Sequence, residues 1–226
     1  MLTTPNYYRV GASDSPTGAL RMALSLLVAH PLAYQRLNTE IATGVANGTI
    51  SSPVIQDSEA RVMPYLQAVL RETLRLFPVP AEAFKEVPPE GDVIAGHRLP
   101  AGTWVGWNLR SMFRRKDLWG DDAELFRPER WLEAAAADKD GDGERFRYLA
   151  GLIDMAFGSG RFQCPGKLLA WTMLGKTIVE VSLFFFSSWT SLIPLYLWFL
   201  ILIPIIEREW ANFSPIIPPK TQFQTR

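Results

Sequence analysis

The only cysteine of this 226-residue chain lies in a glycine-rich segment with the sequence Phe157-Gly158-Ser159-Gly160-Arg161-Phe162-Gln163-Cys164-Pro165-Gly166. One thiol excludes an intramolecular disulfide. With only His30 and His97 beside it, the sequence lacks the ligands for a four-coordinate zinc site. A lone cysteine is ordinarily a small buried apolar residue. The glycines and the proline around Cys164 favour a different interpretation.

The glycines at 158, 160 and 166 let the backbone turn tightly and approach a flat ligand closely. Pro165 is typical of the first turn of a helix, so we expect Cys164 near a helix N-terminus. Free N–H groups and the helix dipole stabilise a thiolate there. A thiolate presented on such a loop can serve as the axial ligand of a haem iron.

The segment resembles the cysteine loop of the cytochrome P-450 haem-thiolate monooxygenases, whose pattern is Phe-Gly-x-Gly-x-Arg-x-Cys-x-Gly. The matching residues are Phe157, Gly158, Gly160, Cys164 and Gly166. Phe162 occupies the place of the family's arginine and Arg161 precedes it, a variant similar to fungal members of the pisatin demethylase type. The resemblance implies that Cys164 binds the haem iron and that the other matching residues, with Arg161, surround the cofactor.

A second motif is Glu72-Thr73-Leu74-Arg75, which places an acid and an arginine on one helix face. Alone it is a common surface pair. In context it resembles the family's Glu-x-x-Arg helix, with Arg130 as the third member. Such a cluster can form charge-assisted hydrogen bonds in a fixed geometry. The resemblance implies a structural role, in which the cluster locks the loop that carries the cysteine.

A third motif, Gly11-Ala12-Ser13-Asp14-Ser15, resembles the oxygen-activation segment of the family's long central helix. There Asp14 and Ser15 would relay protons, a general-acid role. The other interpretation is that Ser13 to Pro16 form a helix cap. Within a helix, Pro16 would leave the Ala12 carbonyl without its usual partner and open the turn.

The segment after the Glu-x-x-Arg helix is similar to one that lines the substrate pocket in the family. Lys85 takes the position of an arginine that contacts a haem propionate, and Phe113-Arg114 stands where many members have His-Arg. The tryptophans are expected to be packing residues.

These motifs require helices before and after a small sheet. Apolar spacing predicts helices over residues 17–30, 31–45 and 62–77, short strands over 81–110, and a helix after Pro165. The runs 134–137 and 139–143 suggest an exposed insertion. The fold is therefore expected to be mainly α with a small β portion, a partial cytochrome P-450 fold over residues 11–180.

The two ends depart from the family pattern. Residues 1–10 do not resemble the first half of the central helix and are treated as an aberrant start. Residues 181–206 carry no charge and are long enough to span a bilayer; a buried or aberrant tail is the alternative. Residues 207–226 form a polar tail. Zero net charge with dispersed basic residues gives no indication of nucleic-acid binding.

The resemblance implies a haem-dependent monooxygenase that inserts one oxygen atom from O2 into a small organic substrate. A flavoprotein, NADPH-cytochrome P-450 reductase, would supply electrons. The location would be a membrane, that of the endoplasmic reticulum. The alternative is a truncated, catalytically inactive fragment, anchored in a membrane by residues 181–206.

Overall fold

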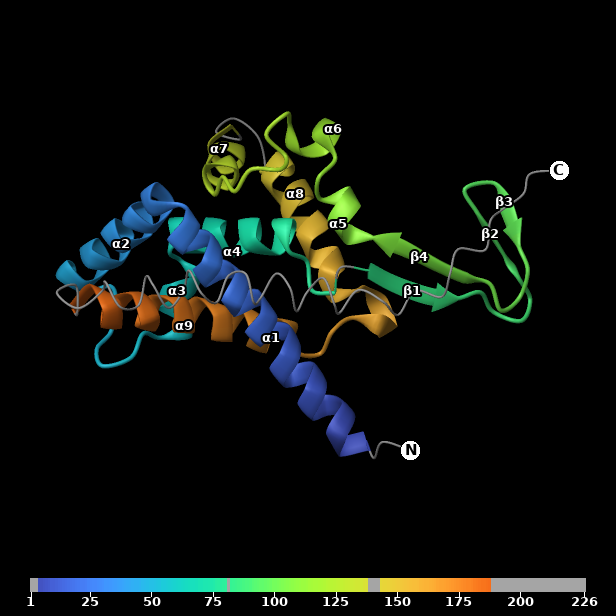
Figure 1. Cartoon of the computed structure of the whole chain (residues 1–226), viewed down its shortest axis with the longest axis horizontal. Coiled ribbons are helices and arrows are strands. Elements are labelled where there is room, and N and C mark those ends of the chain that lie inside the picture. Colours follow the sequence, from blue (N-terminus) through green and yellow to red (C-terminus); the bar gives the residue numbers. More distant parts are fainter. Residues whose placement is uncertain (1–3, 81, 138–142, 188–226) are drawn as a thin grey trace. The chain divides into compact units, whose positions relative to one another are not determined.

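The computed structural model describes residues 4–80, 82–137 and 143–187, which form a group of packed helices from which a small β region projects (Figure 1). The α-helices are α1 (Thr4–Ala29), α2 (Pro31–Ala46), α3 (Asp57–Arg61), α4 (Pro64–Leu76), α5 (Leu109–Met112), α6 (Lys116–Trp119), α7 (Glu129–Ala137), α8 (Glu144–Asp154) and α9 (Lys167–Ser187). Two 3-10 turns, Met155–Phe157 and Gly160–Phe162, precede α9. The strands are β1 (Glu82–Glu86), β2 (Asp92–Ile94), β3 (His97–Leu99) and β4 (Trp104–Asn108). The mainly helical composition with a small β portion agrees with the sequence.

Prolines set several of these boundaries, as predicted. Helix α1 ends at Ala29, and Pro31 begins α2 because a proline lacks the N–H that a first-turn residue leaves unpaired. Pro64 begins α4, and Glu40 of α2 accepts the next two backbone N–H groups, those of Tyr65 and Leu66, at 2.8 and 2.9 Å. A carboxylate at this position both caps the helix and complements its dipole.

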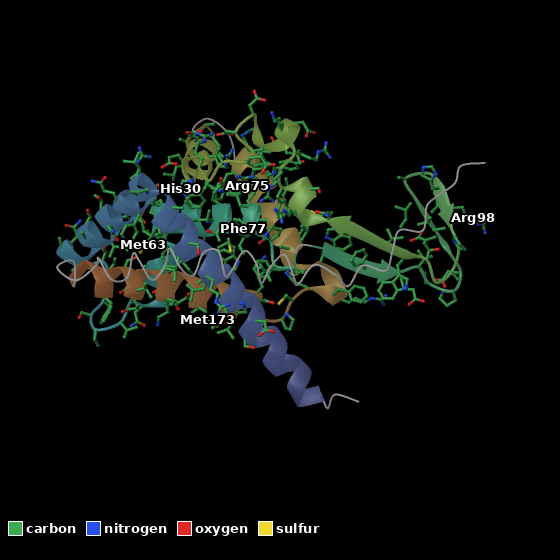
Figure 2. All side chains as sticks on the ribbon, viewed as in Figure 1. His30, Met63, Arg75, Phe77, Arg98 and Met173 are labelled. Carbon is green, nitrogen blue, oxygen red and sulfur yellow. The ribbon has the colours of Figure 1, made fainter. Side chains whose placement is uncertain are left out.

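Helix α4 is the centre of the core. It packs against α1, α2, α3, α7 and α8, and Figure 2 shows Met63 and Arg75, from the two ends of α4, among the surrounding helices. Six apolar positions along this helix are all buried, namely Tyr65, Leu66, Val69, Leu70, Leu74 and Leu76. Removing these side chains from water is the main stabilising contribution of α4.

The strands form two separate antiparallel pairs. Strand β1 pairs with β4 in a register that places Lys85 opposite Val105, and β2 pairs with β3 through Asp92 opposite Leu99. The β2–β3 hairpin lies in the connection between β1 and β4, the two strands of the longer pair. Leu109, directly after β4, is completely buried and joins this ladder to the core.

Two segments contain more helix than the sequence indicated. Helix α1 begins at Thr4 and continues through Gly11, so residues 4–10 are helical, and their departure from the family's central helix stays a prediction. Pro5 lies in the first turn, where a missing N–H costs little. The run 134–137 forms the end of α7, where Ala134 is only 3% exposed because its small side chain packs on the core, whereas residues 135–137 are exposed as expected. Residues 138–142 lie outside the described residues.

Helix α9 follows Pro165 as predicted and extends to Ser187. It carries the chain past residue 181, and the side chain of Ser182 is buried. The rest of the predicted membrane span, residues 188–206, and the polar tail 207–226 lie outside the described residues. Among the helices that the structure describes, none combines the length and the apolar character needed to cross a membrane.

Candidate functional site

The cysteine loop presents an exposed thiol at the start of α9. The backbone N–H of Cys164 donates a hydrogen bond of 2.7 Å to the Phe157 carbonyl, which closes the loop. The Cys164 carbonyl in turn accepts from the N–H of Lys167, the first residue of α9, at 3.3 Å. The thiol is free and exposed. This is the position near a helix N-terminus that the sequence predicted, where a thiolate is favoured.

The backbone of this loop requires glycine at one position above all. Gly158 has a φ of 73°, and a Cβ there would lie 2.5 Å from the Phe162 carbonyl oxygen. Gly160 also has a positive φ, 56°, but open space around it. At Gly166 a Cβ would make only an ordinary 3.7 Å contact with the Cys164 sulfur. Of the three glycines, Gly158 is therefore the one that sets the path of the loop.

Two cations meet on one ring of this loop. The Nζ of Lys85, on β1, lies 4.3 Å from the centroid of the Phe162 ring, and the Arg161 guanidinium lies 4.8 Å from the same centroid. Lys85 also lies 5.7 Å from the Trp107 ring on β4. The ring face attracts both cations electrostatically. The structure thus brings together Lys85 and Arg161, the two residues singled out as cationic neighbours of a cofactor.

The sequence did not indicate the contacts that join the cysteine loop and the start of α9 to α4 and α8. Lys167 forms a 2.8 Å ion pair with Asp154 at the end of α8. Trp171 packs on Phe157 with the ring centroids 6.2 Å apart, and the guanidinium of Arg71 lies 5.5 Å from the Trp171 ring. Arg71 directly precedes Glu72 in the second motif, which was the available signal. These contacts join α4 and α8 to the loop and to α9.

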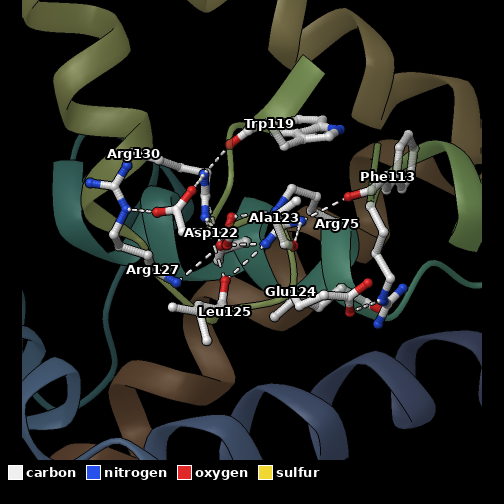
Figure 3. A network of polar contacts seen from close by, with 12 residues as sticks. Arg75, Phe113, Trp119, Asp122, Ala123, Glu124, Leu125, Arg127 and Arg130 are labelled. Carbon is white, nitrogen blue, oxygen red and sulfur yellow. Dashed lines mark hydrogen bonds and ion pairs between the residues drawn. The ribbon is translucent and has the colours of Figure 1, made fainter. Parts of the chain in front are cut away.

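The second motif forms a buried ion cluster (Figure 3). Glu72 and Arg75 are both completely buried and share two hydrogen bonds, 2.8 and 2.9 Å long. Arg75 also donates to three backbone carbonyls, those of Phe113, Ala123 and Leu125, at 2.8, 2.5 and 3.0 Å. Its guanidinium lies 5.3 Å from the Trp119 ring.

Arg130 completes this cluster from α7. Its Nε donates to Glu72 at 2.9 Å, and its Nη atoms reach the carbonyl oxygens of Trp119 and Asp122. The Asp122 carboxylate is 3.2 Å from Arg130 and also pairs with Arg127 at 2.6 Å. Burial acts to raise the pKa of Asp122, but the two guanidinium groups outweigh it, so that the pKa lies below its ordinary value.

The bonds of this ion cluster fix one particular segment. The backbone groups that it binds lie in residues 113–127, and Glu72 further accepts from the backbone N–H of Arg127 and the indole N–H of Trp131. We expected the cluster to lock the cysteine loop. The bonds described here lie instead in the segment between β4 and α7, so any effect on the loop is transmitted through packing.

The residues of the third motif lie inside α1, with Asp14 ten residues past the helix start at Thr4. Both Asp14 and Ser15 are exposed, and Asp14 accepts a 3.0 Å hydrogen bond from the Ser13 hydroxyl. The alternative that they form a helix cap is wrong because the helix begins well before them. Pro16 lies within the same helix, where it has no N–H to offer the Ala12 carbonyl.

Phe113 and Arg114 both make contacts within the protein. Phe113 is completely buried against Trp119, in an edge-to-face contact at 6.3 Å. Arg114 donates to the Leu76 carbonyl at 2.7 Å and to Glu124 at 2.9 Å. Burial lowers the pKa of Arg114, although Glu124 acts in the opposite direction. Arg114 thus binds the end of α4 to the segment after β4.

Comparison with known proteins shows the family of this chain. The sequence pattern of the family Cytochrome P-450 matches residues 10–184. The chain belongs to the cytochrome P-450 family. It is similar to fungal members. It is 40% identical to cytochrome P-450 monooxygenase ABA1 of Pyricularia oryzae over 173 residues, and these residues make up 76% of this chain and 32% of the relative.

Other fungal relatives give the same result. The chain is 38% identical to cytochrome P-450 monooxygenase aba1 of Botryotinia fuckeliana, over 76% of this chain and 32% of that protein. It is 37% identical to pisatin demethylase of Fusarium vanettenii, over 76% of this chain and 31% of that protein. The chain spans about a third of the length of these curated relatives.

The residues of the loop fit a haem bound through sulfur. The family implies this cofactor, and a haem iron needs one axial protein ligand on this side. The exposed Cys164 thiol would supply it, on a loop whose path requires Gly158 because a Cβ there would lie 2.5 Å from the Phe162 carbonyl oxygen. Two cations at Phe162 offer charge for carboxylates at the edge of such a ligand.

Proposed function

We propose that this chain provides the cysteine-ligand side of a haem-thiolate monooxygenase that inserts one oxygen atom from O2 into an organic substrate. The observation that carries the proposal is the exposed thiol of Cys164 at the start of α9, on a loop whose path requires Gly158. A haem bound there supplies the activation of dioxygen, which protein side chains alone cannot perform.

The chain's own residues would hold the cofactor in distinct ways. Cys164 gives the sulfur ligand, and a thiolate donates electron density to the iron more strongly than a neutral ligand does. Lys85 and Arg161 would bind the haem propionates by charge-assisted hydrogen bonds. Their shared contact with Phe162 limits the orientations that the two cations adopt. Phe157, Gly158, Gly160 and Gly166 complete the cradle.

Asp14 and Ser15 would hold and move protons for the reaction at the cofactor. A carboxylate and a hydroxyl at adjacent positions can pass a proton between them and exchange it with solvent. Both are exposed on α1, and the Ala12 carbonyl freed by Pro16 is one turn away. Electrons would come from NADPH-cytochrome P-450 reductase, and the endoplasmic reticulum membrane is the proposed location.

The alternative is an inactive haem-free product, and one observation favours it. The thiol and the Asp14 side chain are both exposed to solvent within the described residues. Catalysis by a haem requires a site that excludes water from the reacting atoms. Haem uptake separates the two candidates.

The test is a reduced, carbon-monoxide difference spectrum of the full chain expressed with haem supplied. We expect a strongly red-shifted Soret band that is lost in Cys164→Ser and kept in Ser159→Ala, a matched change in the same loop. A band without this shift, or no bound haem in the folded chain, would favour the inactive product. Circular dichroism of each variant verifies that the helices form.

A further inference from the structure

A separate cavity is lined by residues of α3, α4, α8 and α9. Its volume is about 240 Å³. That is slightly below the size of a typical pocket for a drug-sized ligand and is ample for a small ion with its water. Its charged lining residues are Asp57, Arg61, Arg71, Asp154 and Lys167.

Most of the charge in this cavity is already neutralised. Arg61 pairs with Asp57 at 2.6 Å, and Lys167 pairs with Asp154 at 2.8 Å. Arg71 is the exception. Among the residues that the structure describes, no carboxylate lies within ion-pair distance of its guanidinium. The cavity therefore contains one positive charge without a paired anion.

The Arg71 guanidinium is held in place and keeps donors available. It lies 5.3 Å from the Phe146 ring and 5.5 Å from the Trp171 ring, so that two aromatic side chains restrict its position. One nitrogen, Nη1, donates to the carbonyl of Gln67 at 3.0 Å and to its side chain at 3.4 Å. Within the described part of the chain, Nε and Nη2 have no acceptor. These two nitrogens form the fork that binds an oxyanion in bidentate fashion.

Partial burial of Arg71 has an energetic consequence. Burial lowers its pKa, because a charge removed from water is less stable, while Asp154 acts weakly in the opposite direction. An anion that enters the cavity would compensate the charge and satisfy the two donors. A guanidinium that is fixed before binding loses little conformational entropy when the ligand arrives.

We propose that this cavity binds a small oxyanion, a phosphate or a carboxylate, through the guanidinium of Arg71. The proposal concerns a different site from the haem and holds whether or not haem binds. The neutralised Arg61 and Lys167 give the cavity walls no further net charge, so the site selects a compact anion and not a polyanion. Trp171 contacts both Arg71 and Phe157, so a bound anion also stabilises the base of the cysteine loop.

The test is the thermal midpoint, Tm, of the full chain in sodium phosphate and in sodium chloride at equal ionic strength, with sodium acetate as a third arm. Saturating phosphate binds the folded state, and we expect a rise in Tm of about 2–4 °C over chloride. Arg71→Gln should lose this rise. Arg115→Gln should keep it, because Arg115 is exposed and pairs with Asp117 outside the cavity.

An equal rise in phosphate for the wild type and for Arg71→Gln would overturn the proposal, as would no rise in either oxyanion. The acetate arm identifies which of the two anion types binds. If Arg71→Gln does not fold, nuclear magnetic resonance of the Arg71 Nε–H group in the wild type replaces it. A saturable phosphate-dependent shift of that signal supports the site, and an unchanged signal overturns it.

Discussion

The ion cluster around Glu72 and the loop around Cys164 have opposite surroundings. Glu72, Arg75 and Arg130 are at most 6% exposed. Each guanidinium nitrogen of the two arginines donates a hydrogen bond to an acceptor within the chain. The cysteine loop presents its thiol, Arg161 and Phe162 to solvent. The chain itself satisfies the charged groups of the cluster, whereas the loop leaves its thiol and the Arg161 side chain exposed.

The difference teaches where the chain's stability and its chemistry reside. A buried ion cluster supports the folded state only while all its partners are present, because removal of one partner leaves a buried charge unpaired. We expect changes in the exposed part of the loop to cost less stability than changes in the ion cluster. The following variants test this division, from the largest expected effect to the smallest.

Glu72→Gln should be the most damaging change. It leaves the guanidinium groups of Arg75 and Arg130 buried without their shared carboxylate, which costs about 3–5 kcal/mol of unfolding free energy. Urea unfolding followed by circular dichroism measures the loss. Glu133→Gln is the matched control, because Glu133 is exposed and pairs with Arg127 at the surface. If both variants lose equal stability, burial is not what makes the cluster important.

Gly158→Ala should have the next largest effect, and a local one. A non-glycine residue in this conformation, with φ 73° and ψ −174°, costs roughly 1–3 kcal/mol, and the Cβ would also clash with the Phe162 carbonyl oxygen at 2.5 Å. We expect a lower thermal midpoint together with a changed reaction rate of Cys164 with a disulfide reagent. Gly160→Ala, with open space around the Cβ, should change both quantities less. The reverse order would show that another glycine sets the loop.

Glu40 gives the helical framework a pH response. Burial raises the pKa of Glu40 from its ordinary value of 4.5, although the N–H groups of Tyr65 and Leu66 act to lower it. The folded state therefore binds a proton more tightly than the unfolded state. This stabilising contribution is complete below pH about 4.5 and is lost as the pH rises through the folded pKa.

Glu40→Gln removes this titration. The unfolding free energy of the wild type, relative to that of Glu40→Gln, should therefore fall between pH 4 and pH 7. Denaturant midpoints at three pH values measure it. A difference that grows with pH would contradict the sign of the pKa shift, and the reactivity of the Cys164 thiol should be the same in both proteins at each pH.

Phe162→Ala should cost least. It removes the ring that Lys85 and Arg161 share, and exposed cation–π contacts contribute about 0.5–1 kcal/mol. A small change in urea midpoint with intact helical circular dichroism is expected. Phe162→Leu controls for the loss of apolar area. A cost like that of Glu72→Gln would mean that the loop supports the fold after all.

Local patterns made much of this architecture predictable. The proline at 31, the proline at 165 and the apolar face of α4 set helix boundaries through backbone chemistry that operates within a few residues. The grouping of Glu72, Arg75 and Arg130 was also predictable from the motifs. The carbonyl oxygens that bind Arg75 were not, because residues 113–125 supply them from a segment without regular spacing.

Other features depend on contacts between distant segments. Ala134 is buried although a run of alanines gives no directional signal, and helix α1 starts at Thr4 in a polar stretch. Lys85 meets Phe162 only because β1 and the cysteine loop are adjacent in the fold. The anion-binding role proposed for Arg71 could not be predicted from the sequence. It depends on the absence of a carboxylate near the guanidinium among the described residues, and no local sequence pattern indicates that absence.

The ladder between β1 and β4 places one limit on how this sequence can change. Side chains alternate between the two faces of a strand, so a slip of one residue would turn Lys85 away from the ring of Trp107 and from Phe162. The hairpin between the strands can lengthen or shorten freely, because its residues lie outside the ladder. An insertion within 82–86 would instead reverse the face on which the lysine lies.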